Sequence, residues 1–321
     1  MKRKFKVLLT CIGHQPKELF LKKIKESTKY NYQIIGTDIN KNTKNRKYVD
    51  FFYKVPPGKH KKYKEIIYNI CLKHKVNLVL PGADEEVFSL IKNKEKMKKI
   101  NCFLPILEKK KLDKISSKIN LCNYMRNLKI PFYKWKKILD YSSLKQSLED
   151  YSKKKKACVI KLPISRGGRG VYILDDKNKG IFNPDKGARE IHTNFKLFNK
   201  NLKKKIKLKF PILLTERLIE PVYDIDILAL KGNLKKIVIR KRKISANPDY
   251  GHTVVKDPKI LKYCKNIVKK MDLSYLLDFD IMFDEKNNPK LIEINPRMSG
   301  SISESYKKNI FLIDDLINFI L

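Results

Sequence analysis

Apolar positions in the first ninety residues follow two different periods. Residues 5–13, "FKVLLTCIG", and 32–40, "YQIIGTDIN", are short apolar runs typical of strands, and residues 16–27 between them carry apolar side chains at helical spacing. Residues 62–76 predict another helix, which is followed by a strand ending at Pro81 and Gly82 and by a helix opened by Asp84. Strand, helix, strand at this spacing predicts a parallel sheet, and ligands bind such sheets at the carboxyl ends of the strands.

A second pattern begins after residue 113. An amphipathic helix is expected within residues 115–135, and it should stop at Ile130, because Pro131 forces the preceding residue into an extended conformation. Residues 157–174, "ACVIKLPISRGGRGVYIL", then predict a hairpin of two strands, with Lys161 on the first and a glycine-rich tip. Such a tip exposes backbone N–H groups and can fold over phosphates as a lid. It is not a P-loop, because no G-K-[ST] opens a helix.

Charged residues alternate with apolar ones in the next two strands. Asp224 and Asp226 are two positions apart, so they share one face of a strand, and so do Arg240 and Arg242 on the strand that follows. The alternative for the two arginines is plain solvent exposure on an amphipathic strand.

The last pattern is a hairpin with strands at 277–283 and 290–295. Asp280 and Glu293 both have apolar neighbours, and two carboxylates in an apolar setting need a cation or a shared proton. With Asn295 as a third oxygen donor, the set suits Mg²⁺, and Arg297 beyond the strand end can reach phosphoryl oxygens. The alternative is an ordinary hairpin whose acids point outward.

Composition changes this picture little. The chain has 321 residues, 42% of them hydrophobic, and a formal charge of +40. The lysines are spread along the whole chain, which indicates biased genomic composition more than a nucleic-acid surface. No apolar stretch reaches eighteen residues and the N-terminus lacks a signal-peptide pattern, so we expect a cytoplasmic protein that makes no use of a membrane. The six cysteines are far apart, as expected for reduced thiols.

The first lobe also invites a dinucleotide interpretation, since Asp38 ends the second predicted strand where an acid would meet a ribose. The turn after the first strand, however, has one glycine where the fingerprint needs three. NAD binding is therefore an alternative that the pattern does not favour.

Taken in order along the chain, these motifs resemble the ATP-grasp superfamily. The resemblance rests on Lys118, on Lys161 with its glycine loop, on Glu216, Asp224 and Asp280, and on "EINPR" at 293–297. Within the superfamily the chain is most similar to the stand-alone carboxylate-amine ligases related to carbamoyl phosphate synthetase and biotin carboxylase. The resemblance implies an α/β fold: an N-terminal parallel βαβ (pre-ATP-grasp) lobe at 1–113, then a two-lobed α+β ATP-grasp domain at 114–321. In that domain the lid subdomain should span about 135–213 and the C-terminal catalytic lobe about 214–321.

The resemblance also implies roles for single residues. Those assigned to the nucleotide are Lys118, Lys161, Ser165, Gly167, Gly168, Gly170, Glu216, Leu218 and Asp224. Those assigned to metal are Asp280, Glu293 and Asn295, with Glu293 between two ions, and those assigned to catalysis are Arg297, Arg240 and Arg242. Asp113 and Lys114 form a competing register for Lys118, because the family usually has Asp-Lys where this chain has Ser117 before Lys118.

The activity implied is an ATP-dependent carboxylate-amine ligase, or a carboxylate-thiol ligase, that acts through an acyl phosphate and releases ADP and phosphate. Its cofactors would be ATP and two Mg²⁺ ions, with Mn²⁺ as a substitute, and its partners a small carboxylate and an amine. Pairing into a homodimer stays open. A nucleotide- or nucleic-acid-binding protein that kept the fold without turnover is the alternative.

Overall fold

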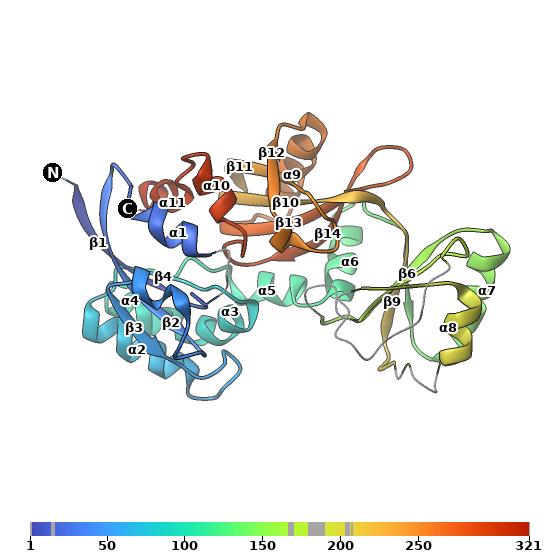
Figure 1. Ribbon diagram of the computed structural model, residues 1–321, viewed down its shortest axis with the longest axis horizontal. Helices are drawn as coiled ribbons and strands as arrows, with labels where there is room; N and C mark the ends of the chain where they lie inside the picture. The colour runs from blue at the N-terminus through green and yellow to red at the C-terminus, as the bar shows by residue number, and fades with distance from the viewer. Residues whose placement is uncertain are drawn as a thin grey trace. The chain divides into compact units, whose positions relative to one another are not determined.

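The computed structural model describes residues 2–13, 17–165, 170–178, 190–202, 206 and 208–320 (Figure 1). The chain forms two compact units, and each is built from separated segments. Unit 1 consists of Met1–Leu112, Val222–Asp280 and Ile294–Leu321, and unit 2 consists of Asp113–Pro221 and Ile281–Glu293.

The N-terminal part of unit 1 is a four-stranded parallel sheet in the order β3-β2-β1-β4. The strands are β1 (Arg3–Leu9), β2 (Tyr30–Asp38), β3 (Phe51–Lys54) and β4 (Leu78–Leu80). The helices of this region are α1 (Lys17–Ile24), α2 (Tyr63–His74), α3 (Asp84–Leu90) and α4 (Lys94–Lys99). The predicted parallel βαβ lobe is therefore confirmed, while β3, a four-residue edge strand, was not predicted.

Unit 2 begins within α5 (Lys109–Ile115) and continues with α6 (Lys118–Asn127). Helix α6 starts where the sequence places a serine, because the Ser117 side chain caps it by accepting a hydrogen bond from the Asn120 backbone N–H at 3.1 Å. The lid hairpin predicted around Lys161 is present: Lys161 at the end of one strand is opposite Val171 at the start of the next.

A five-stranded sheet forms the body of unit 2, in the order β5-β9-β6-β7-β8. Its strands are β5 (Trp135–Ile138), β6 (Cys158–Lys161), β7 (Val171–Leu174), β8 (Glu190–Thr193) and β9 (Ile212–Glu216). Two helices, α7 (Tyr141–Lys153) and α8 (Phe195–Asn201), supply apolar side chains such as Leu144 and Phe198 to its core.

The third sheet has the order β12-β11-β10-β13-β14. Its strands are β10 (Ile219–Leu230), β11 (Asn233–Arg242), β12 (His252–Val255), β13 (Tyr275–Phe283) and β14 (Pro289–Asn295), and α9 (Pro258–Lys270) lies between β12 and β13 in the sequence. Neighbouring β13 and β14 are the hairpin that the sequence predicts, with β13 beginning two residues earlier than expected and β14 one.

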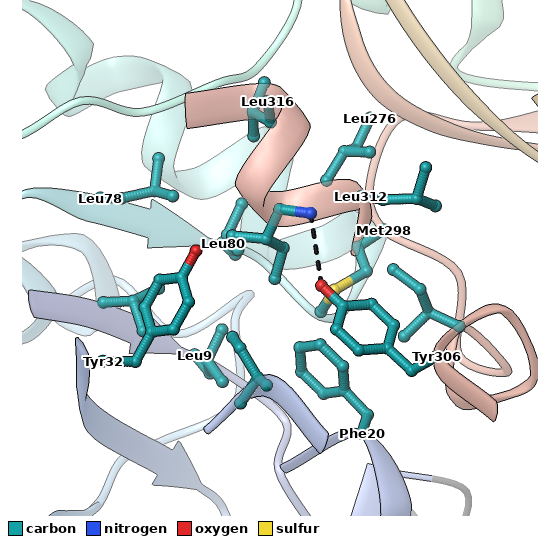
Figure 2. Packing of buried hydrophobic residues seen from close by; sticks show 14 of the residues in the cluster. Leu9, Phe20, Tyr32, Leu78, Leu80, Leu276, Met298, Tyr306, Leu312 and Leu316 are labelled. Atoms are coloured by element: carbon teal, nitrogen blue, oxygen red, sulfur yellow. Dashed lines mark hydrogen bonds between the residues drawn. The ribbon is translucent and has the colours of Figure 1, made fainter. Parts of the chain in front are cut away.

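The main core of unit 1 joins the two ends of the chain (Figure 2). Helices α10 (Ser303–Lys307) and α11 (Leu312–Ile320) bring Tyr306, Leu312 and Leu316 into one cluster with Leu9 and Phe20. The rings of Phe20 and Tyr306 meet edge to face with their centroids 5.0 Å apart.

Polar contacts secure the same junction. The Tyr32 hydroxyl donates to Asp314 Oδ1 at 2.6 Å, and the Ser27 hydroxyl donates to Asp314 Oδ2 at 2.5 Å. The N-terminal sheet is thus closed by residues that lie almost three hundred positions later.

Two general expectations can be compared with the structure. All six cysteines are free thiols, and five of them are buried. Over the described ranges, none of the helices combines the length and the apolar character that crossing a membrane requires.

Candidate active site

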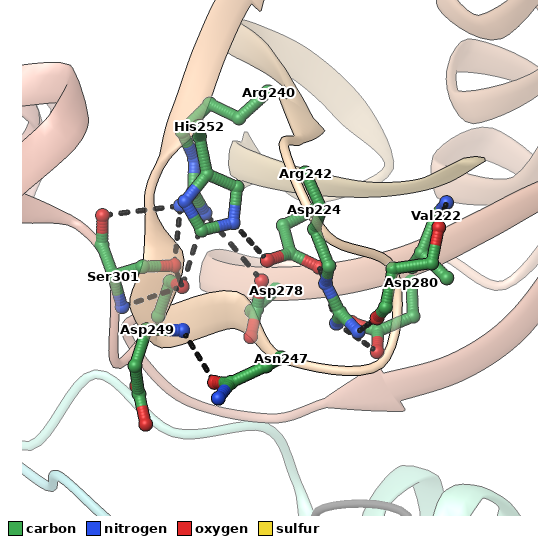
Figure 3. Close-up of polar contacts among 12 residues, drawn as sticks. Val222, Asp224, Arg240, Arg242, Asn247, Asp249, His252, Asp278, Asp280 and Ser301 are labelled. Atoms are coloured by element: carbon green, nitrogen blue, oxygen red, sulfur yellow. Dashed lines mark hydrogen bonds and ion pairs between the residues drawn. The ribbon is translucent and has the colours of Figure 1, made fainter.

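Charged side chains gather on the third sheet, in the part that belongs to unit 1 (Figure 3). They are Asp224 and Asp226 on β10, Arg240 and Arg242 on β11, His252 on β12, and Asp278 and Asp280 on β13. Strand register brings them together, since Asp224 is opposite Arg240 and Arg242 is opposite His252. The alternation seen in the sequence therefore places acids and arginines side by side across neighbouring strands.

Arg240 is wholly buried at the centre of this group. Its guanidinium donates to Asp226 Oδ1 at 2.7 Å, to the Ser299 hydroxyl at 3.0 Å and to the Ser301 carbonyl at 3.1 Å. A second carboxylate, Asp278, has its Oδ1 at 3.7 Å from the same guanidinium. All these partners are internal, so the predicted contact of Arg240 with a substrate stays a prediction.

Burial sets the protonation of this pair. Removal from water acts to lower the pKa of Arg240, but the carboxylates around it, Asp226 foremost, hold that pKa above its usual value. Burial raises the pKa of Asp226, against the opposing effect of Arg240. The arginine therefore stays charged, and it compensates a carboxylate that would otherwise tend to take up a proton.

Arg242 joins two carboxylates nearer the end of its strand. Its Nε donates to Asp224 Oδ1 at 2.8 Å and its terminal nitrogen donates to Asp280 Oδ2 at 2.9 Å. Asp224 also bonds His252 Nε2 at 2.6 Å. Burial acts to raise the pKa of Asp224, yet the His252 hydrogen bond and Arg242 outweigh it and hold the pKa below its usual range. Both oxygens of this acid, predicted to lie near a ribose, thus have protein partners.

Arg297, just beyond β14, is held by two acids. Its NH1 donates to Asp278 Oδ2 at 2.9 Å, and its Nε lies 3.3 Å from Asp84 Oδ1. The Asn295 side-chain nitrogen donates to the same Asp278 oxygen at 3.4 Å. Neither Asp278 nor Asp84 was predicted as a site residue. The spacing could have indicated Asp278, because it is two positions from Asp280 and shares its face.

In unit 2 the structure brings together Lys118, Lys161 and Glu293. Lys118 Nζ lies 3.9 Å from Glu293 Oε2 and donates to the Ser165 carbonyl at 3.1 Å. Burial, and next to it the positive charge of Lys118, lowers the pKa of Lys161 to about 8. Four predicted site residues, Ser165 among them, are therefore neighbours.

The competing register places its lysine elsewhere. Lys114 Nζ lies over the ring of Tyr124, 5.0 Å from the centroid. Of the two lysines, Lys118 is thus the one that lies beside Glu293.

The residues predicted to read the adenine also lie in unit 2. Glu216 Oε1 accepts a hydrogen bond from the Lys134 backbone N–H at 2.8 Å, and the Glu216 N–H donates to the Lys134 carbonyl at 3.1 Å. Leu218 is buried in a small cluster with Leu213 and Tyr133. Their contact with a nucleotide stays a prediction.

The predicted lid loop is only partly described. Gly167 and Gly168 lie outside the described residues. Gly170 has a φ of +69°, and a Cβ on it would stand 2.5 Å from Leu162 Cδ1, so both conformation and space require glycine there.

Asp38, the residue behind the dinucleotide alternative, is buried at the end of β2. Its Oδ2 accepts from the Gly13 N–H at 2.7 Å and its Oδ1 from the Asn40 N–H at 2.9 Å. The acid thus holds two backbone turns together.

A second buried acid lies at the carboxyl ends of β1 and β4. Glu86 accepts hydrogen bonds from the Tyr63 hydroxyl at 2.8 Å, the Gly82 N–H at 3.1 Å and the Thr10 hydroxyl. The buried ammonium group of Lys17 donates to the Thr10 carbonyl at 3.0 Å, and burial lowers the pKa of this lysine. Gly82 therefore packs against both Thr10 and Lys17.

The predicted metal ligands divide between the units, Asp280 and Asn295 in unit 1 and Glu293 in unit 2. Among the described residues, no three His, Cys, Asp or Glu side chains gather as a preformed metal site. Mg²⁺ does not need one, since it keeps several waters and takes phosphate oxygens from its substrate. The donors fit this ion: two carboxylates, and an amide whose nitrogen is engaged by Asp278, which leaves its oxygen for a cation.

Two family models match the sequence. Residues 209–320 match the family described as ATP-grasp in the biosynthetic pathway with Ter operon, and residues 7–105 match the PylC-like N-terminal domain. A search of the curated proteins found no significant match.

Several solved structures share the fold. L-amino acid ligase from Bacillus licheniformis has a TM-score of 0.63 at 15% identity, over 95% of this chain and 70% of that one. N5-carboxyaminoimidazole synthetase from Staphylococcus aureus, complexed with ADP, has a TM-score of 0.63 at 10% identity, over 96% and 74%. The biotin carboxylase domain of Hydrogenobacter thermophilus 2-oxoglutarate carboxylase, complexed with MgADP, ADP and bicarbonate, has a TM-score of 0.57 at 17% identity, over 92% and 64%.

At such low identities these structures demonstrate the fold, and the sequence matches supply the family. The predicted mixed α/β architecture, with its N-terminal parallel lobe, is confirmed by both. Residues 209–320 therefore belong to an ATP-grasp family, and they follow a PylC-like N-terminal domain at residues 7–105.

Proposed function

We propose that this protein is an ATP-dependent ligase that joins a carboxylate to an amine through an acyl phosphate and releases ADP and phosphate. The observation that carries the proposal is the pair of lysines beside Glu293 in unit 2. Lys118 and Lys161 are buried close enough for one to lower the pKa of the other, and the half-buried carboxylate of Glu293 adjoins Lys118. Two buried ammonium groups that repel each other favour an added negative charge, and a polyphosphate supplies it.

The remaining roles follow the same chemistry. Lys118, Lys161 and the loop that starts at Ser165 hold the phosphates, and Glu216 and Leu218 adjoin the adenine. Asp280, Glu293 and Asn295 hold two divalent ions, Mg²⁺ or Mn²⁺. The ions, when bound, neutralise charge on the phosphoryl oxygens during transfer.

The arginines act on the acid substrate and on the transferred group. A carboxylate is a poor electrophile because its leaving group would be an oxide, whereas an acyl phosphate loses phosphate readily. Arg297 stabilises charge on the γ-phosphoryl group, and Arg242, with Arg240 behind it, orients the substrate carboxylate. An amine then attacks the acyl carbon. Related proteins whose names state an acid or amine substrate, such as the L-amino acid ligase, support this substrate class.

The first test needs no knowledge of the substrate. We expect ATP with excess Mg²⁺ to raise the melting temperature, since a ligand at a hundredfold excess over its Kd stabilises the native state by about 2.7 kcal/mol. Glu293→Gln should lose the Mg²⁺-dependent part of this shift. Glu285→Gln, which changes an exposed acid in the turn of the same hairpin, is the matched control and should keep it.

Turnover is tested by ADP release in the presence of pooled carboxylates and amines, with hydroxylamine added to trap an acyl phosphate as a hydroxamate. ADP release that depends on a carboxylate, together with hydroxamate formation, supports the ligase. A thermal shift with NADH or RNA but none with MgATP would contradict the proposal.

A further inference from the structure

We propose that Asp278 is a positioning residue that orients Asn295 and Arg297 through one carboxylate oxygen, and that metal affinity at Asn295 depends on it. The inference rests on the proposed function, because it assumes that Asn295 binds a cation and that Arg297 acts on a phosphoryl group. Asp278 lies within β13 and is not among the site residues predicted from the sequence.

The geometry is a shared acceptor. Asp278 Oδ2 accepts from Arg297 NH1 at 2.9 Å and from the Asn295 side-chain nitrogen at 3.4 Å. A carboxylate oxygen only accepts hydrogen bonds, so it selects the nitrogen end of the Asn295 amide. The amide oxygen is thereby left on the other side, where a cation can use it. Asp278 thus fixes which atom of Asn295 is the donor to metal.

The Asp278 side chain is itself held in place by a buried arginine. It is 6% exposed, and its other oxygen, Oδ1, lies 3.7 Å from the guanidinium of Arg240. Arg240 is fixed in turn by Asp226 and by two serines of the segment after β14. A rigid buried group therefore supports a carboxylate that contacts two proposed site residues, which is how outer residues orient metal ligands in proteins.

One isosteric substitution distinguishes a positioning role of Asp278 from a purely stabilising role. Asp278→Asn keeps the shape but removes the charge and turns one acceptor into a donor. If the new amide oxygen faces Arg297 and Asn295, the new NH₂ group faces the guanidinium of Arg240. In the opposite orientation the NH₂ group faces Arg297 and Asn295. Each orientation loses a favourable contact, and the Asn295 amide is no longer held in one orientation.

The matched control is Asp226→Asn. Asp226 is likewise buried, but it accepts hydrogen bonds from Arg240 and Ser305, neither of which is a proposed metal ligand. Both variants should lower stability, because both leave a buried guanidinium without a full partner. In Asp226→Asn the guanidinium of Arg240 is still held by Ser299 and Ser301 beside Asp278, so only Asp278→Asn should change the metal requirement.

The experiment titrates Mn²⁺ and, separately, Mg²⁺ into each protein in the presence of a non-hydrolysable ATP analogue, with metal binding followed by calorimetry and by the thermal shift. For Asp278→Asn we expect the apparent metal Kd to rise about 10- to 100-fold, and for Asp226→Asn to stay within about twofold of the original protein. Equal changes in the two variants would overturn the inference, because they would show that Asp278 only stabilises the sheet.

A reciprocal exchange gives a second, independent readout. The Asp278→Asn/Asn295→Asp double variant keeps the number of carboxylates and reverses the direction of the hydrogen bond, so a metal-binding oxygen is again held in place. We expect it to recover most of the metal affinity lost by Asp278→Asn, and it also serves if the single variant does not fold. No recovery would contradict a positioning role.

The two proposals fail in different ways. If the unaltered protein shows no metal-dependent binding of the analogue, the proposed function fails and this inference with it. If the unaltered protein binds metal and analogue but Asp278→Asn does so equally well, only the inference fails.

Discussion

The buried pair of Arg240 and Asp226 allows a quantitative test of how unit 1 is stabilised. Arg240→Met keeps the aliphatic part of the side chain and removes the guanidinium, so it creates little empty space. It leaves the Asp226 carboxylate in the interior with the Ser305 hydroxyl but without its guanidinium partner, and it also removes one of the two guanidinium groups beside Asp278. An uncompensated carboxylate then remains away from water.

The size of the effect follows from that desolvation. Removing one partner of a buried ion pair costs about 3–5 kcal/mol, whereas replacing both partners by apolar groups is often neutral. We therefore expect Arg240→Met to lower the free energy of unfolding by about 3–5 kcal/mol. Adding Asp226→Leu should recover about 2 kcal/mol or more, because the lone carboxylate is then gone.

Protonation gives the same prediction a pH dependence. Burial already raises the pKa of Asp226, and loss of Arg240 raises it further. A carboxyl group whose pKa is higher in the folded state binds more protons there, so it favours folding as the pH falls. The loss of stability in Arg240→Met should accordingly be smaller at pH 5 than at pH 8.

Urea denaturation with two signals is a suitable assay. Trp135, the single tryptophan, lies in unit 2 and reports that unit by fluorescence, while ellipticity reports both units. The ellipticity transition should move to lower urea in Arg240→Met. A loss below about 1 kcal/mol, with no recovery in the double variant, would refute the argument that Arg240 compensates a buried charge.

Two further predictions concern Lys161 and Gly82. Lys161, with a pKa of about 8, binds fewer protons when folded than its unfolded form with a pKa of 10.5, so stability should rise as the pH increases between these values. A bound phosphate should raise the pKa of Lys161 again, so the binding of MgATP above pH 8 should take up a proton. Calorimetry in buffers of different ionisation enthalpy measures this proton uptake. The Lys161→Arg variant should abolish the uptake. Gly82→Ala would place a Cβ 2.5 Å from the Thr10 carbonyl oxygen and 2.4 Å from Lys17 Nζ. It should lower stability by about 1–3 kcal/mol in urea denaturation, and an unchanged midpoint would contradict this packing argument.

Local pattern predicted the strands and hairpins well where apolar alternation is strong. The hairpin of β13 and β14 and the strand pair around Lys161 were both expected from the sequence, and both are present. Strand β3 was missed because it is a short edge strand of four residues, two of them half-buried and two exposed. So short a strand without a buried face shows little periodicity in its sequence.

The partners of the charged side chains were harder to predict than the strands that carry them. The sequence indicated that Arg240 and Arg242 share a face, but it did not indicate that this face is interior or which acids meet them. Those partners depend on the order β12-β11-β10-β13-β14, which places β13 beside β10 although about fifty residues separate them. Asp84 was missed for the same reason, since it reaches Arg297 from a helix more than two hundred positions earlier.

The junction between the two ends of the chain has a consequence for the order of synthesis. Leu9, Phe20 and Leu80 share one core with Met298, Tyr306 and Leu316. About 220 residues separate Leu80 from Met298, and a ribosome working at roughly 5–20 residues per second needs about 10–45 s to make them. During that interval the apolar face of the first sheet emerges without its cover. Chaperones that shield nascent chains should therefore bind the early N-terminal segment and leave it only when α10 and α11 have been made.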